Sequence, residues 1–135
     1  MQFFQTTSNE NATLLNPLVL AFVGDAVQTL FIRAKLATST DYKAGELHRQ
    51  TAMQVKSHTQ AESAERLLPI LSKEELAVYT RARNAKCNTI AKNSSIADYK
   101  KASGLEAVFG YLYLTSQSAR LEELLNLAVI IPSQV

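Results

Sequence analysis

The sequence predicts an all-α protein, and three observations support this class. Apolar residues recur at the three- and four-residue spacing of helix faces, and no segment alternates apolar and polar residues as a half-buried strand does. The 135 residues include only 4 Gly and 3 Pro, too few for a turn-rich β-sandwich. A chain of this length fits one domain, which we assign to residues 1–135 with a core over about 16–128.

The first predicted helix begins at Asn16-Pro17 and contains the segment LVLAFVGDAVQTLFIRAKL. Asn caps free backbone N–H groups, and Pro suits the first helical position. Because the segment is apolar on nearly every side, we expect a central buried helix that ends before the polar run at 38–41. Helical spacing then resumes, with a break near Ser57 and an end at Pro69.

The second half of the chain predicts three more helices and a loop. Ser72 and Glu75 have the spacing of a capping box, which opens a helix. The stretch 84–97 is rich in Asn, Ser and Lys and is expected to be a loop. A second strongly apolar helix runs through 105–113, and a last one opens at Ser118.

Composition excludes several classes of protein. Hydrophobic residues make up 47% and charged residues 19%, which indicates a compact rather than a disordered chain. The single cysteine, Cys87, allows neither an intramolecular disulfide nor a Cys-x-x-Cys metal site, and a reducing, cytosolic setting fits best. The amino terminus lacks the pattern of a signal peptide, and the longest apolar run, Leu18 to Val23, is too short to span a membrane.

The charge is unevenly distributed, although the net charge is only +2. Residues 43–101 carry 11 Lys and Arg against 6 Asp and Glu, and both flanking segments are net negative. A basic middle between acidic ends suits a phosphate-binding face beside a carboxylate cluster. Ordinary solvated helix faces explain the charge equally well.

Two carboxylates, Asp25 and Glu106, lie in the two most apolar predicted helices. A buried carboxylate without a partner is costly, so each must be paired, hydrogen-bonded or bound to a metal. If the two helices pack together, both acids can hold a hard cation such as Mg²⁺. Two structural alternatives stay open, because Ser103 and Glu106 have the spacing of a capping box and Asp25 could cap a helix break after Gly24.

Two segments resemble, in the right order, the motifs of the ribonuclease III family. LAFVGDAVQTLFIR, from Leu20 to Arg33, is similar to the family signature, and SGLEAVFGYLYL, from Ser103 to Leu114, is similar to its second acidic motif. Segments 47–62 and 81–93 resemble the Mini-ribonuclease III subfamily. That subfamily has no separate double-stranded-RNA-binding domain, and we expect none here.

The resemblance implies a metal-dependent endoribonuclease that cuts double-stranded RNA and leaves 5′-phosphate and 3′-hydroxyl ends. Asp25 and Glu106 would be catalytic and hold Mg²⁺, for which Mn²⁺ can substitute. The implied substrate is precursor ribosomal RNA, notably the large-subunit (23S) RNA, in the bacterial cytoplasm or in a plastid. The implied partners are a second copy of the chain and a ribosomal protein. Phe22 would pack into the partner subunit, with a place in the core as the alternative.

Two acids of the longer enzymes are missing, since their positions correspond to Ala21 and Ser103. Fewer acids imply weaker or more water-mediated metal binding. The Ser103 hydroxyl could hold a metal-bound water, although an N-cap is the alternative role. The thinner set keeps open a second hypothesis, a catalytically silent RNA-binding or ribosome-assembly module on the same fold.

The expected RNA contacts are basic and amide side chains, because A-form RNA is recognised largely through its phosphates and 2′-hydroxyls. The first group is Arg81, Arg83, Asn84, Lys86 and Lys92. The second group is His48, Arg49 and Lys56, for which a solvated helix surface is an equal alternative.

Overall fold

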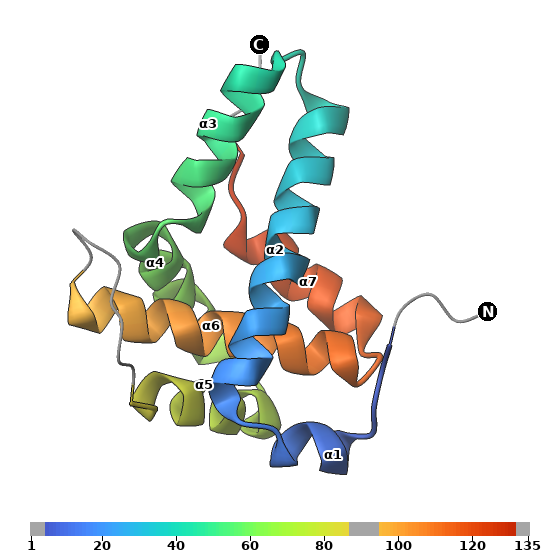
Figure 1. The fold of residues 1–135 in the computed structure, drawn as a ribbon, viewed down its shortest axis with the longest axis vertical. Coiled ribbons are helices and arrows are strands. Elements are labelled where there is room, and N and C mark those ends of the chain that lie inside the picture. Colours follow the sequence, from blue (N-terminus) through green and yellow to red (C-terminus); the bar gives the residue numbers. More distant parts are fainter. Residues whose placement is uncertain (1–4, 87–94, 132–135) are drawn as a thin grey trace.

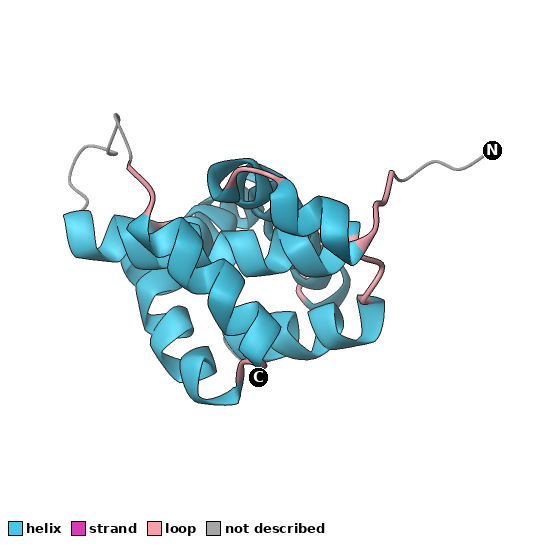
Figure 2. Cartoon of the chain, turned by 90° about the horizontal axis from the view of Figure 1, so that it is seen from below, coloured by secondary structure: helices cyan, strands magenta, loops and turns pink. Residues whose placement is uncertain are grey.

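The structure is a computed structural model that describes residues 5–86 and 95–131. Helix is the only regular secondary structure in these two ranges (Figure 2), which confirms the predicted all-α class. The elements are α1 (Asn9–Leu14), α2 (Pro17–Ser39), α3 (Ala44–Val55), α4 (Ser57–Leu67), the 3₁₀ turn η1 (Leu68–Ile70), α5 (Lys73–Asn84), α6 (Ile96–Leu114) and α7 (Ser118–Ala128).

Helix α2 begins where the sequence predicts and ends later. The Asn16 side chain accepts a hydrogen bond of 2.8 Å from the Leu18 N–H, and Pro17 is the first helical residue. The helix continues to Ser39 because the hydroxyls of Thr38 and Ser39 donate to backbone carbonyls one turn earlier. Polar residues at a helix end therefore did not stop the helix here.

Helices α2 and α6 cross at very close range (Figure 1). A Cβ atom added at Gly24 would lie 1.6 Å from the backbone oxygen of Glu106, and one added at Gly110 would lie 2.0 Å from the backbone oxygen of Leu20. Only glycine allows two helix backbones to approach this closely. The crossing therefore brings Asp25, the residue after Gly24, next to Glu106.

Helix α2 is central, but it is not buried on all sides as the sequence suggested. Phe22 is 79% exposed and Leu30 is 63% exposed. By length and composition alone α2 would also suit a membrane span, which is weak evidence because a core helix passes the same test. Its buried side chains pack mainly on α6, whereas Val19, Phe22 and Leu30 form an uncovered apolar face.

The remaining predicted helices are present, with two boundaries corrected. The break between α3 and α4 falls at Lys56, and the capping box of Ser72 and Glu75 opens α5. Helix α6 begins at Ile96, where the Ser95 hydroxyl accepts a hydrogen bond of 3.0 Å from the Asp98 N–H. The predicted loop at 84–97 was too long at both ends, because α5 still includes residue 84 and the polar first turns of α6 give no apolar face to detect.

Helix α1 was not predicted, because six residues are too few to show a periodic pattern. Ser8 caps it, and Ala12 is fully buried, so the core begins before residue 16. Arg81 on α5 donates hydrogen bonds to the backbone oxygens of Thr13 at 3.0 Å and Leu15 at 3.2 Å. These bonds join the end of α1 to α5.

Candidate active site

The two acidic side chains meet where α2 and α6 cross. Glu106 is half-buried, and its carboxyl group is close enough to the Asp25 carboxyl group for the two to interact. Asp25 itself is exposed, which corrects the expectation that it is buried. Its carboxylate therefore faces solvent, where a substrate can approach, while Glu106 lies behind it in the crossing.

The pair has no neutralising partner in the part of the chain that the structure describes. Burial raises the pKa of Glu106 to about 8, and the negative charge of Asp25 together with the hydrogen bond between the two groups adds to the increase. Within the described residues, no Lys, Arg or His forms an ion pair with either acid. A divalent cation would replace the shared proton and neutralise both carboxylates, so the pair fits a metal site.

Both structural explanations of the acids are wrong. Ser103 lies inside α6 and is 7% exposed, so it is not an N-cap and forms no capping box with Glu106. Gly24 and Asp25 lie inside a continuous α2, so Asp25 caps no break. Neither carboxylate has a role in ending or starting a helix.

The donor set for a metal is small. The part of the chain that the structure describes contains no group of three or more His, Cys, Asp or Glu residues placed to hold a metal ion. Ala21 is buried one turn before Asp25, and Ser103 is buried one turn before Glu106. Two carboxylates plus water suit Mg²⁺, which keeps several waters, better than Zn²⁺, which takes nitrogen and sulfur ligands.

An apolar recess of about 400 Å³ lies beside the carboxylate pair. Because Phe22 in its wall is largely exposed, its alternative role as a core residue is excluded within this chain. Contiguous exposed apolar surface of this kind is typical of a protein contact. The recess is lined by Phe22, Val23, Asp25, Ala26, Val27, Leu30 and Tyr113.

Of the first group of predicted RNA-binding residues, three have side-chain contacts within the described residues. Arg81 holds α1 through two hydrogen bonds. The guanidinium of Arg83 lies 5.9 Å from the centre of the Tyr79 ring, and its Nε donates to the side-chain oxygen of Asn84 at 3.3 Å. Lys86 is exposed. Lys92 lies outside the described residues.

The second group lies on and just after α3. His48 and Lys56 are exposed, whereas Arg49 is bound to the Glu46 carboxylate at 2.6 Å. His48 shares a pocket with Arg33, a residue that the sequence analysis did not select. The available signal was spacing, because Arg33 follows Asp25 by two helical turns.

Comparison with known proteins agrees with this architecture. Residues 18–117 match the model of the Ribonuclease III domain. The chain therefore belongs to the ribonuclease III family, and it is an endoribonuclease.

Within that family the chain is most usefully compared with the Mini-ribonuclease 3 proteins. It is 42% identical over 132 residues to Mini-ribonuclease 3 of Thermoanaerobacter sp. (strain X514), covering 96% of this chain and 93% of that protein. It is 44% identical over 116 residues to Mini-ribonuclease 3 of Clostridium tetani, covering 85% and 77%. A crystal structure of a Fusobacterium nucleatum protein superposes with a TM-score of 0.78 at 27% identity, covering 89% of this chain and 94% of that one.

Proposed function

We propose that this endoribonuclease is metal-dependent, cuts double-stranded RNA and matures precursors of large-subunit (23S) ribosomal RNA. The observation that carries the proposal is the pairing of Asp25 with Glu106, two acids that have no counter-charge among the described residues. The ribonuclease III family is generally metal-dependent and acts on double-stranded RNA. The ribosomal substrate follows from the resemblance to the Mini-ribonuclease III subfamily.

Asp25 and Glu106 are the residues that would hold the ion, Mg²⁺ or Mn²⁺ in its place. When bound, such an ion polarises the scissile phosphate and lowers the pKa of the attacking water. The backbone contact at Gly24 fixes the separation of α2 and α6, and thereby the spacing of the two carboxylates. The exposed side chain of Asp25 faces the incoming RNA, and hydrolysis leaves 5′-phosphate and 3′-hydroxyl ends.

The acting species in this proposal is a dimer formed through the apolar recess beside Asp25. Phe22 and Leu30 expose apolar surface that a second copy of the chain would cover. The family functions as a dimer, and two carboxylate pairs allow both RNA strands to be cut. Phe22→Asp should yield monomers in analytical ultracentrifugation, whereas Leu127→Asp, at an exposed apolar residue of α7, should not.

The proposed RNA face comprises the basic residues near the end of α5, with Arg83 and Lys86 as its described members and Lys92 beyond them. A ribosomal protein partner would help a chain with few RNA contacts to choose its target. The relatives are bacterial, which is consistent with a cytoplasmic enzyme.

The test is cleavage of a labelled RNA duplex in Mg²⁺ and in EDTA by the purified protein. We expect metal-dependent cutting of both strands, lost in Asp25→Asn but kept in Glu122→Gln, which alters an exposed acid of α7. Asp25→Asn should still bind the duplex. An intact duplex that the wild-type protein binds in Mg²⁺, with a precursor ribosomal RNA also tried, would support the catalytically silent RNA-binding module.

A further inference from the structure

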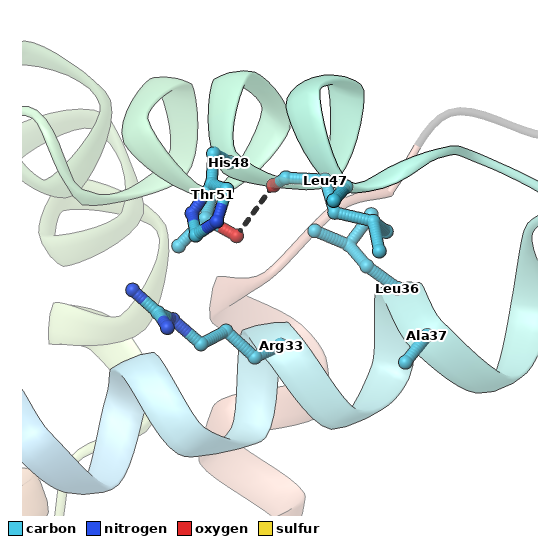
Figure 3. Close-up of a pocket in the computed structure, with 7 residues that line it drawn as sticks. Arg33, Leu36, Ala37, Leu47, His48 and Thr51 are labelled. Atoms are coloured by element: carbon cyan, nitrogen blue, oxygen red, sulfur yellow. Dashed lines mark hydrogen bonds between the residues drawn. The ribbon is translucent and has the colours of Figure 1, made fainter.

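A second pocket, of about 200 Å³, lies between the carboxyl-terminal half of α2 and the adjacent α3. Figure 3 shows Arg33 extending from α2 toward His48 and Thr51 on α3, with Leu36 and Leu47 side by side at one end. The lining residues are Arg33, Leu36, Ala37, Ala44, Leu47, His48 and Thr51. The lining thus combines apolar side chains with two nitrogen-bearing side chains, Arg33 and His48.

These two nitrogen-bearing side chains have no partner within the described residues. Arg33 and His48 are both exposed, and neither forms an ion pair or a hydrogen bond there. No acid is among the described residues that line the pocket, and the nearest acid on α3, Glu46, is already bound by Arg49 at 2.6 Å. The pocket is therefore an electropositive recess, suited to an anion that accepts hydrogen bonds from a guanidinium.

This electropositive pocket and the carboxylate pair are linked through α2, which contributes residues to both. The buried side of α2 follows a four-residue stripe that includes Gly24, Gln28, Ile32 and Leu36. Asp25 and Arg33 lie on the neighbouring four-residue stripe, two turns apart. At roughly 1.5 Å per residue, Arg33 is about 12 Å along the helix axis from Asp25.

We propose that Arg33 and His48 bind a backbone phosphate of the RNA duplex, on the strand whose scissile phosphate lies at Asp25 and Glu106. The inference rests on the proposed function. An RNA backbone fits because the guanidinium binds phosphate oxygens in a bidentate manner, and the aliphatic wall of Leu36 and Leu47 accommodates the ribose. A phosphate bound at a fixed distance from the acids sets the register of cleavage without reading sequence.

The first test measures duplex binding in the Asp25→Asn background, so that binding is separated from cutting. Fluorescence anisotropy with a labelled duplex, from about 50 to about 200 mM KCl, gives the affinity and its salt dependence. Arg33→Ala should weaken binding about tenfold and make the slope of log K against log salt shallower by about one. Lys73→Ala, which removes one charge from an exposed residue of α5, is the matched control and should change neither value as much.

The second test maps cut sites in the active enzyme. Arg33→Ala and His48→Ala should spread cleavage over neighbouring phosphates, and Arg33→Lys should recover affinity more than register, because lysine keeps the charge but not the fork. A slope and cut-site pattern identical to those of Lys73→Ala would overturn the phosphate site while leaving the proposed function intact. A wild-type protein that neither binds nor cuts the duplex would overturn the proposed function itself, and this site with it.

Discussion

Two glutamates in neighbouring helices are buried or half-buried, and they have opposite kinds of partner. Glu75 on α5 is 3% exposed and accepts hydrogen bonds from two nitrogens of Arg120, both at 2.9 Å, and from the Ser72 N–H at 2.8 Å. Glu106 on α6 is half-buried and faces a second acid, Asp25. The first carboxylate is surrounded by donors, and the second is placed beside a like charge.

The pKa values of the two carboxyl groups record this difference. Burial by itself raises the pKa of Glu75, but the hydrogen bonds from Arg120 and from the Ser72 N–H outweigh it, and the pKa is lowered. For Glu106 burial raises the pKa to about 8, and Asp25 adds to the same effect. Acids that are left without a counter-charge, in a fold that pairs another acid with arginine, indicate function rather than stability.

The largest expected effect is the loss of catalysis when Glu106, the acid without a counter-charge, is replaced. Glu106→Gln keeps the volume of the side chain and removes its charge, so we expect the single-turnover cleavage rate in saturating Mg²⁺ to fall by about 10³-fold or more. Glu122→Gln serves as the control. If Glu106→Gln kept activity within about tenfold, the two glutamates would not differ in function.

The second effect is the loss of stability when Glu75 is deprived of its partner Arg120. Arg120→Ala leaves Glu75 buried without its ion pair and also removes the hydrogen bond to the Ile70 carbonyl. We expect the free energy of unfolding in urea to fall by about 3 kcal/mol, because a broken buried pair leaves an uncompensated charge. Cleavage per folded molecule should stay near the wild-type value. A loss no greater than that of Lys73→Ala would show that the pair contributes little.

The carboxylate pair could be predicted from sequence, whereas the ion pair could not. Asp25 and Glu106 stand out because each interrupts an apolar helix, and both helices are visible in local periodicity. Glu75 was recognised only as a capping residue, because its partner Arg120 is 45 positions away. Local patterns contain no record of such a long-range contact.

The same limit explains the exposed face of α2 and the pocket at its end. Apolar periodicity shows that a side chain avoids water, but not whether its own chain or a second copy covers it, so Phe22 looked equally suited to the core. Arg33 and His48 are brought together only by the packing of α3 on α2. Residues that act together through tertiary contacts can therefore be identified only from the structure.

The third effect is a pH dependence that should be visible when metal is removed. Because the pKa of Glu106 is raised from 4.5 to about 8 in the folded protein, its contribution to stability is present below pH 4.5 and is lost as the pH rises through about 8. Glu75 behaves in the opposite sense, and its contribution is lost as the pH falls below 4.5.

In EDTA, Glu106→Gln should therefore be more stable than the wild type near pH 9, by about 1 to 3 kcal/mol, and similar to it near pH 5. Half-burial reduces the effect below the full linkage value. Thermal unfolding across this range measures the difference, and Mg²⁺ should raise the midpoint of the wild type more than that of the variant. If the difference in stability between Glu106→Gln and the wild type did not vary with pH, the pKa of Glu106 would not be raised in the folded protein.

The smallest effect is expected at a third glutamate, Glu46. It tests whether burial or an arginine partner determines how much a carboxylate contributes to stability. Glu46 is bonded to Arg49 at 2.6 Å and to Gln50 at 2.8 Å, and the hydrogen bond from Arg49 is the main reason that its pKa is lowered to about 2. The geometry of this pair resembles that of Glu75 with Arg120, but both side chains lie within one helix turn and are open to solvent, which screens their attraction. Glu46→Gln should leave the thermal midpoint at neutral pH unchanged, both in low salt and in high salt. A loss of stability as large as that of Arg120→Ala would mean that a carboxylate can stabilise the fold through its hydrogen bonds even when it is exposed. The contrast between Glu75 and Glu106 would then reflect their different partners and not their burial.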